Sequence, residues 1–252
     1  MPKFGNYKKE ETLSYTLGVF PSMELINTHP EKVKALLLHP DAERNDGAVK
    51  LMRLCKQKGI YTETAPRVLQ RLSGKENCFA ALAFEKYTEA LCGDRDHVVL
   101  VSCQDRGNMG TILRTALGFR YCDIALIRPC CDVYDPHVVR ASMGALFHHR
   151  LNLFDSFEEY REAYPEHELY MFRLRNADTL QKLPATGKGP LSLVFGNEAS
   201  GLPKELENIG HGVRIDHSSE IDSLNLSVAA SIGMYAFRTM EISRGSGSAQ
   251  EG

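Results

Sequence analysis

Arg114 is the residue whose setting most clearly suggests chemistry. It stands in DRGNMGTILRTALGF, residues 105–119, where a loop enters an amphipathic helix whose packing face would consist of Ile112, Leu113, Ala116 and Leu117. Arg114 then lies on the opposite face. Open α/β sheets bind ligands at the carboxyl ends of their strands, so a guanidinium there could meet negative charge. The plainer alternative is that Asn108 caps the helix and Arg114 forms a surface ion pair.

Two later segments have a similar character. In LSLVFGNEASGLP, residues 191–203, an apolar strand breaks at Gly196, which would let the backbone approach a flat ligand, and Glu198 adds a carboxylate. In IDSLNLSVAASIG, residues 221–233, Ser223 and Asn225 precede the last helix. Either could simply be its N-cap. Each segment is weak evidence alone, because glycine turns and polar caps occur in many α/β proteins.

The elements expected around these loops form two groups. Residues 1–92 predict a small α/β/α domain, with helices over 13–27, 46–58 and 66–72 and strands over 33–38 and 79–84. Stronger strands over 97–103, 123–128, 168–174, 191–195 and 213–216 alternate with helices, which predicts a mostly parallel sheet covered on both faces. We therefore expect an α/β fold with domains at 1–92 and 97–241.

Three further signals mark helix ends and the tail. Residues 156–159 form a capping box, and Pro165 should end the helix that it starts. Pro203 and Gly210 should bracket a second helix. Residues 242–252 are rich in glycine and serine and are expected to form a disordered tail. The last helix is apolar nearly all round to Met240, which suggests that a second copy of the chain covers it as a homodimer.

Charge and cysteine content exclude several classes of protein. Residues 1–92 carry 14 Lys and Arg against 11 Asp and Glu, whereas residues 93–252 carry 16 against 21, so positive charge is concentrated in the first part. Seven cysteines with no CxxC pair argue against a zinc site and against a disulfide framework. With no apolar run long enough to span a bilayer and no signal peptide, we expect a cytoplasmic location, no membrane contact and no metal.

Taken together and in this order, the three segments resemble the signature motifs of the SpoU/TrmH family of RNA 2'-O-ribose methyltransferases, over about residues 97–240. The N-terminal part is similar, more loosely, to the L30e-like substrate-binding domain that many members carry. The resemblance implies S-adenosylmethionine as cofactor, structured RNA as substrate, ribosomal RNA favoured over transfer RNA, and a C-terminal trefoil knot of the SPOUT class, a rare exception to the rule against threading.

The resemblance also implies roles for individual residues. Those in the reaction centre would be Arg114, Asn108, Glu198, Ser223 and Asn225. Those enclosing the cofactor would be Val194, Phe195, Gly196, Asn197, Ile215, Leu224 and Ser227. Two positions depart from the family pattern, because Arg120 and Ser231 stand where glycine is usual.

The chemistry of this site would depend mainly on positioning and electrostatics. An arginine stays protonated in proteins, so Arg114 is better suited to stabilise a developing alkoxide and hold a phosphate than to act as a base, although a phosphate-assisted base role stays open. Two other functions compete. One is a nucleotide-binding α/β enzyme, which the absence of GxGxxG and GxxxxGK[ST] weakens. The other is a non-catalytic, dimeric RNA-binding protein with a relic methyltransferase domain.

Overall fold

The computed structural model describes residues 4–74, 78–183 and 189–247, and the side chains as far as Met240. Among the described residues, the chain forms two compact units. The first comprises the residues up to Tyr87 together with Met109–Arg114 and Cys131–His148, and the second comprises the rest. Two short pieces from the middle of the chain therefore pack with the N-terminal elements.

The first unit contains a four-stranded sheet between helices. Its strand order is β1 (Leu13–Tyr15), β4 (Ala80–Glu85), β2 (Val33–Leu38), β3 (Thr62–Thr64). Helix α3 (Pro66–Ser73) covers one face of this sheet through Leu69 and Leu72. The other helices of the N-terminal segment are α1 (Val19–Thr28), which contacts β4, α2 (Asp46–Gln57), which packs on α1, and the 3-10 helices η1 (Pro30–Lys32) and η2 (Ala42–Arg44).

The helix expected over residues 13–27 is partly wrong. Residues Leu13–Tyr15 form β1, because they pair antiparallel with β4, and the helix begins only after Gly18, whose φ is 102°. Local periodicity could not reveal that pairing, since its partner strand lies more than sixty residues further along the chain.

The second unit is built on a seven-stranded sheet in which every neighbouring pair is parallel, so the α/β fold with a mostly parallel sheet is confirmed. The strand order is β7 (Arg150–Phe154), β6 (Asp123–Ile127), β5 (His97–Val101), β10 (Leu191–Phe195), β8 (Glu168–Phe172), β11 (His211–Arg214), β9 (Asp178–Thr179). The edge strands β7 and β9 were not predicted. β7 mixes buried with partly exposed residues, and β9 has only two residues.

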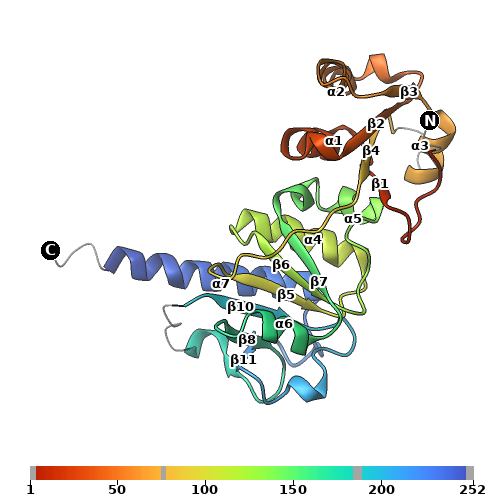
Figure 1. The fold of residues 1–252 in the computed structure, drawn as a ribbon. Helices are drawn as coiled ribbons and strands as arrows, with labels where there is room; N and C mark the ends of the chain where they lie inside the picture. The colour runs from red at the N-terminus through yellow and green to blue at the C-terminus, as the bar shows by residue number, and fades with distance from the viewer. Residues whose placement is uncertain (1–3, 75–77, 184–188, 248–252) are drawn as a thin grey trace. The chain divides into compact units, whose positions relative to one another are not determined.

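Helices cover both faces of this sheet (Figure 1). On one face, α6 (Phe157–Ala163) buries Phe157 and Tyr160 in a cluster with Val99, Ala125 and Val194. On the other, α7 (Leu226–Gly247) brings Phe237 against Tyr170, with ring centroids 4.6 Å apart. Because neighbouring residues of a strand point to opposite faces, a buried strand can pack against the helices on both faces of the sheet. The remaining helices are α4 (Arg106–Gly118), α5 (Pro136–Ala141), η3 (Ala145–His148), η4 (Leu180–Lys182) and η5 (Lys204–Leu206).

The residues predicted to begin and end helices do so only in part. Ser156 caps α6, accepting a hydrogen bond from the Glu159 backbone N–H at 3.2 Å, but the Glu159 carboxylate accepts from the Asp155 N–H instead of closing the box. Pro203 and Gly210 bracket only the single 3-10 turn η5, so the longer helix expected there is wrong. Helix α7 runs to Gly247, and residues 248–252 of the expected tail lie outside the described residues.

A buried polar chain ties the segment before β5 to the amino ends of the strands. His97 donates from Nε2 to the carbonyl oxygen of Cys92 at 3.0 Å, and its Nδ1 lies 2.8 Å from the Tyr160 hydroxyl. That hydroxyl lies 2.6 Å from Ser192 Oγ, which in turn is 2.9 Å from Nδ1 of His167. Burial lowers the pKa of His97 to about 4, with a contribution from His167, so His97 is neutral at pH 7.

We predict that this burial makes stability depend on pH. The pKa of His97 is about 4 in the folded protein against an ordinary 6.5, so the unfolded chain binds more protons in this window. The contribution of His97 to stability is present above pH 6.5 and is lost as pH falls toward 4, with a slope of up to ~1.4 kcal/mol per pH unit. Urea unfolding across the window measures it. His97→Gln should flatten the dependence, whereas exposed His137→Gln should not, and equal slopes in all three proteins would contradict the assignment.

Candidate functional site

Asn108 is left available for a site because another residue caps its helix. The Oδ1 atom of Asp105 accepts a hydrogen bond from the Asn108 backbone N–H at 2.7 Å, so Asp105 is the N-cap of α4. The Asn108 side chain instead contacts both later segments. Its Nδ2 donates to Glu198 Oε1 at 3.4 Å, and its Oδ1 accepts from Asn225 Nδ2 at 3.0 Å. The interpretation of Asn108 as a simple cap is therefore wrong.

Glu198 holds the loop after β10 against the loop after β5. Its Oε1 accepts from the Asp105 backbone N–H at 3.1 Å, and its Oε2 accepts from the Gln104 backbone N–H at 3.4 Å and from Asn197 Nδ2 at 3.1 Å. Burial alone would raise the pKa of this carboxyl. Hydrogen bonds from its own N–H, from Asp105, and from the Asn108 and Cys103 side chains outweigh burial and lower the pKa. Glu198 is therefore an ionised carboxylate surrounded by donors.

The loop after β10 folds tightly on itself. Asn197 and Gly201 exchange two backbone hydrogen bonds of 2.9 Å, and the Asn197 Oδ1 accepts from the Ala199 N–H at 2.9 Å. A Cβ atom on Gly196 would overlap the backbone of Gly201 and Leu202. The close approach that requires glycine here is thus made by the protein's own backbone, which is a different reason from the ligand contact that the sequence suggested.

Asn225 joins the site to the start of the last helix. Its Oδ1 accepts from the Ser227 backbone N–H at 2.9 Å and from Ser227 Oγ at 2.7 Å, so it is the N-cap of α7 while its Nδ2 donates to Asn108. The three segments, up to 117 residues apart, therefore meet through Glu198, Asn108 and Asn225.

A cavity of about 390 Å³ lies beside this meeting point. Most of the predicted residues of the second and third segments line it, namely Phe195, Gly196, Asn197, Glu198, Ser223 and Leu224. Ile215, which was also predicted, lies between these segments and lines the cavity too. The side chain of Val194 is instead fully buried in the core cluster with Val99 and Met171. The Ser227 hydroxyl is used at the start of α7 and does not line the cavity.

The sequence did not single out one wall of the cavity. Phe172 ends β8, and Arg173, Leu174 and Arg175 follow it. Phe172 stacks on Phe195 with ring centroids 4.3 Å apart. Lys204 and His217 complete this wall. The position of residues 172–175 along the chain could have identified them. These residues lie at the carboxyl end of a predicted parallel strand, where α/β folds bind ligands.

Arg114 lies on the exposed side of α4, as the helical pattern predicted. Met109, Ile112, Leu113 and Ala116 are fully buried, and Leu117 is partly exposed. Among the residues that the structure describes, no acidic side chain forms an ion pair with Arg114, so the surface ion pair is not found. The described residues likewise contain no group of three His, Cys, Asp or Glu placed to hold a metal ion, and none of the described helices could span a membrane.

Two curated proteins illustrate the relatives of this chain. An uncharacterized tRNA/rRNA methyltransferase of Synechocystis is 30% identical over 57% of this chain and 53% of its own length. The 23S rRNA (guanosine(2553)-2'-O)-methyltransferase RlmP of Bacillus subtilis is 28% identical over 60% of each chain. The match thus spans little more than half the length of either relative.

A solved structure and a family model complete the comparison. An AdoMet-bound rRNA methyltransferase from Sinorhizobium meliloti has the same fold, with a TM-score of 0.77, 23% identity and coverage of 90% of this chain and 87% of that one. The model of the SpoU rRNA Methylase family matches residues 96–235, which contain all three segments and more than half of the 252 residues. The chain belongs to the SpoU rRNA Methylase family.

Proposed function

We propose that the chain is an S-adenosylmethionine-dependent RNA 2'-O-ribose methyltransferase. The observation that carries the proposal is the contact of Asn108 with both Glu198 and Asn225, which brings three polar segments together beside one cavity. The family membership supports RNA methylation, and the activity of the Bacillus subtilis relative supports the ribose 2'-oxygen and ribosomal RNA. We favour ribosomal RNA over transfer RNA, and a cytoplasmic location.

The cavity suits the proposed cofactor. Its volume of about 390 Å³ falls within the range of roughly 300–1,000 Å³ that small-molecule sites occupy. Phe172, Phe195, Ile215 and Leu224 provide apolar surface for a flat base, while Gly196 and Asn197 offer backbone groups. Val194, buried in the core, would support this wall from behind, and Ser227 would act by fixing Asn225. The AdoMet that is bound to the Sinorhizobium meliloti protein adds support for this ligand class.

Bound S-adenosylmethionine would supply an electrophilic methyl group for attack by the ribose hydroxyl. Asn108, Ser223 and Asn225 would orient the ribose, and Arg114 would stabilise the negative charge that develops on its oxygen. Glu198 is poorly suited to be the base, because five donors surround its carboxylate and its pKa is lowered. We assign it the organising of the two loops, and the hydroxyl proton would leave to water or to an RNA phosphate oxygen.

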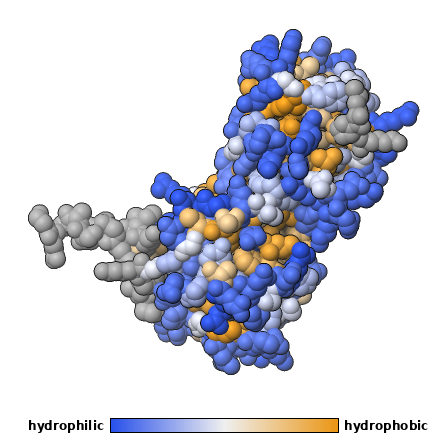
Figure 2. Space-filling view, in the orientation of Figure 1, coloured by the Kyte–Doolittle hydropathy of each residue, from blue (hydrophilic) through white to orange (hydrophobic). Residues whose placement is uncertain are grey.

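The RNA would also contact the first unit, for which we retain the L30e-like substrate-binding role of residues 1–92. The outer side of α2 carries exposed Lys50, Arg53 and Lys56, three and six residues apart along one helix. Figure 2 shows hydrophilic side chains over the region where Figure 1 places α2. None of these three cations has an ion pair among the described residues, so they suit a phosphate backbone.

We further propose a homodimer through α7. Met234 and Phe237 face the sheet, but Val228, Ile232 and Tyr235 are 46%, 36% and 58% exposed. Their spacing of four and three residues places them in one stripe along the helix, as expected of a surface that pairs with a second helix. The methylase domain at 97–241 and the trefoil knot stay predictions, and of the tail expected at 242–252 the structure describes residues 242–247 as the end of α7.

The direct test of the function is methyl transfer. Purified protein, RNA and S-adenosylmethionine should yield 2'-O-methylated nucleotides when modification is mapped across total RNA with and without the protein. RNA binding without any transfer would favour the non-catalytic, dimeric RNA-binding alternative. Methylation of a base nitrogen would retain the cofactor but reject the ribose assignment.

We predict that Arg114→Ala abolishes methyl transfer while sparing the cofactor site. Ile112, Leu113 and Ala116 keep the helix packed, so the variant should fold. Removing a donor to a developing oxyanion should lower the single-turnover rate about 100- to 1000-fold. Arg114→Lys should stay impaired, because an ammonium cannot form the same planar fork.

Calorimetry without RNA and with a chelator should give the same S-adenosylmethionine affinity for wild type and Arg114→Ala. Exposed Arg161→Ala on α6 is the matched control and should react at the wild-type rate. Wild-type turnover by Arg114→Ala at saturating RNA would refute the catalytic assignment.

We predict that Lys50→Glu combined with Arg53→Glu weakens RNA binding without changing cofactor binding. Each lost phosphate contact should reduce the slope of log affinity against log salt by about 1. Filter binding over a salt series measures this slope, and Arg161→Glu is a charge-reversal control at an exposed position of the second unit. An unchanged slope would remove α2 from the RNA surface.

We predict a mass in solution of about twice the 28.2 kDa of one chain. Ile232→Glu should convert the dimer to a monomer, because it places a charge in the apolar stripe. Leu153→Glu changes another exposed apolar residue, on the edge strand β7, and should leave the mass unchanged. Light scattering after size exclusion measures both, and an active wild-type monomer would overturn the proposal.

A further inference from the structure

Residues Cys131–His148 connect β6 to β7 of the large sheet, yet they pack with the N-terminal elements in the first unit. Phe84 of β4 is fully buried, and its ring lies 5.9 Å from the ring of Tyr134 and 5.4 Å from that of Phe147. Nε2 of His148 lies 2.7 Å from Glu24 Oε2 of α1. A connection of the methylase sheet is thus anchored to residues that precede that sheet in the sequence.

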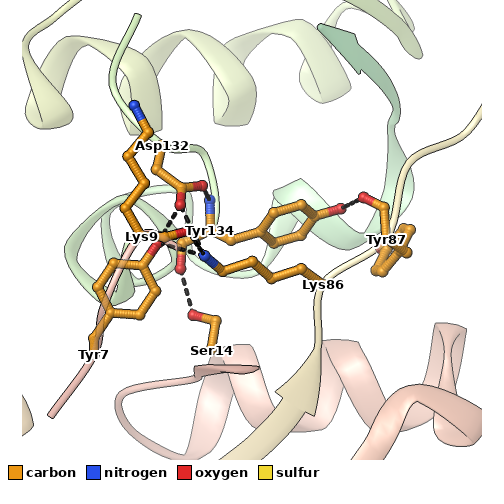
Figure 3. A network of polar contacts seen from close by, with 7 residues as sticks. All are labelled: Tyr7, Lys9, Ser14, Lys86, Tyr87, Asp132 and Tyr134. Atoms are coloured by element: carbon orange, nitrogen blue, oxygen red, sulfur yellow. Dashed lines mark hydrogen bonds and ion pairs between the residues drawn. The ribbon is translucent and has the colours of Figure 1, made fainter. Parts of the chain in front are cut away.

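A polar network fixes the start of this connection (Figure 3). Asp132 Oδ2 accepts from Lys86 Nζ at 2.9 Å and from the hydroxyl of Tyr7, and the Tyr7 hydroxyl itself accepts from Lys86 at 3.0 Å. Asp132 Oδ1 accepts from the Tyr134 backbone N–H at 2.9 Å. Ser14 donates to the Tyr134 carbonyl oxygen. Tyr7, Ser14 and Lys86 therefore all contact the connection at Asp132 or Tyr134.

The network is mostly shielded from water. The Lys86 and Asp132 side chains are each only 15% exposed. Burial, reinforced by the hydrogen bond to Asp132, also raises the pKa of Tyr7, so its phenol stays protonated as a donor. Replacing one partner of such a pair leaves the other charge buried without compensation, which costs far more than breaking an exposed ion pair. The start of the connection is thus firmly held.

A later part of this segment, at the end of α5, touches the helix that carries Arg114. Helix α5 ends at Ala141, and a Cβ atom placed on Gly110 of α4 would overlap the Ala141 side chain and lie 2.9 Å from the Ser142 backbone nitrogen. Gly110 and Arg114 are four residues apart, so they lie on the same side of α4, one turn from each other. A shift of residues 132–142 would therefore change the packing against the turn of α4 that precedes Arg114.

We infer that Asp132, held by Lys86 and Tyr7, is a positioning residue for Arg114. Asp132 acts through α5 and Gly110, and the position of Arg114 then depends on contacts with the N-terminal part of the first unit, residues 4–87. The inference rests on the role given to Arg114 in the proposed function. It adds that this N-terminal part does more than bind RNA, because it also sets the position of a residue of the reaction centre.

The first test compares Asp132→Asn with Glu85→Gln. Both replace a carboxylate by its amide and both break a lysine ion pair, but the Glu85–Lys34 pair is 46% and 41% exposed. Among the described residues, neither of these side chains forms an ion pair with the connection. Asp132→Asn should lower the single-turnover rate at saturating RNA by about 10- to 100-fold, the range that a remote misplacement of about 1 Å can produce. RNA and cofactor affinities should not change, and Glu85→Gln should react as wild type.

Lys86 provides a rescue pair for the same test. Lys86→Met should reproduce the rate loss, whereas Lys86→Arg keeps a cation that can donate to Asp132 and should restore most of the rate. A variant that unfolds at lower temperature but reacts at the wild-type rate would reduce the network to a structural role. A loss of RNA affinity with an unchanged saturated rate would also overturn the inference, since it would place Asp132 in the RNA surface.

The second test does not depend on activity. Hydrogen exchange of Asp132→Asn should be faster than wild type at the backbone amides of residues 109–114 and 131–148, and unchanged in β10. Wild-type exchange at 109–114 would refute the mechanical link, whatever the rates show. If wild type transferred no methyl group, the proposed function would fail, while this measurement would still decide whether Asp132 positions the turn before Arg114.

Discussion

The site depends on the hydrogen bonds that the carboxylate of Glu198 accepts. It accepts backbone and side-chain hydrogen bonds from the loop after β5, and one of its donors, Asn108 in the first turn of α4, also accepts a hydrogen bond from Asn225 at the start of α7. Without these bonds, two buried strand ends would carry loops with unpaired donors, which is costly near a protein core. A single ionised group thus gives three distant segments a common geometry.

The large sheet explains why those segments can meet at all. β5 and β10 are neighbours in register, with Val99 opposite Val194, so the loops that leave their carboxyl ends start side by side. Helix α7 packs on the same sheet through Phe237 and Gly233, whose missing side chain admits the Phe172 ring. The apolar core therefore fixes where the strands and helices end. The polar contacts at those ends then fix the conformation of the loops that carry the site residues.

The hydrophobic pattern predicted the strong strands and the parallel sheet, because it is a local signal, and the family resemblance supplied seven of the residues that line the cavity. The sequence could not predict β1, which exists by pairing with distant β4, or the stacking of Phe172 on Phe195 across strands. The segment Cys131–His148 is a sharper case. Sequence order assigns it to the methylase domain, but Asp132 and Tyr134 bind residues from the start of the chain. Contacts between residues far apart in the sequence cannot be predicted from the local composition around either residue.

The tight turn at Gly196 also bears on how readily a ligand can bind. The loop from Asn197 to Gly201 is closed by its own backbone hydrogen bonds, and the side chains of Asn197 and Glu198 are engaged by groups of the protein itself. The entropy of ordering this wall is consequently lost when the chain folds and not when a molecule enters. A rigid, preformed wall should favour fast, weakly temperature-dependent association. It should also select ligands by shape, because changing the conformation of the wall to fit another ligand would cost free energy.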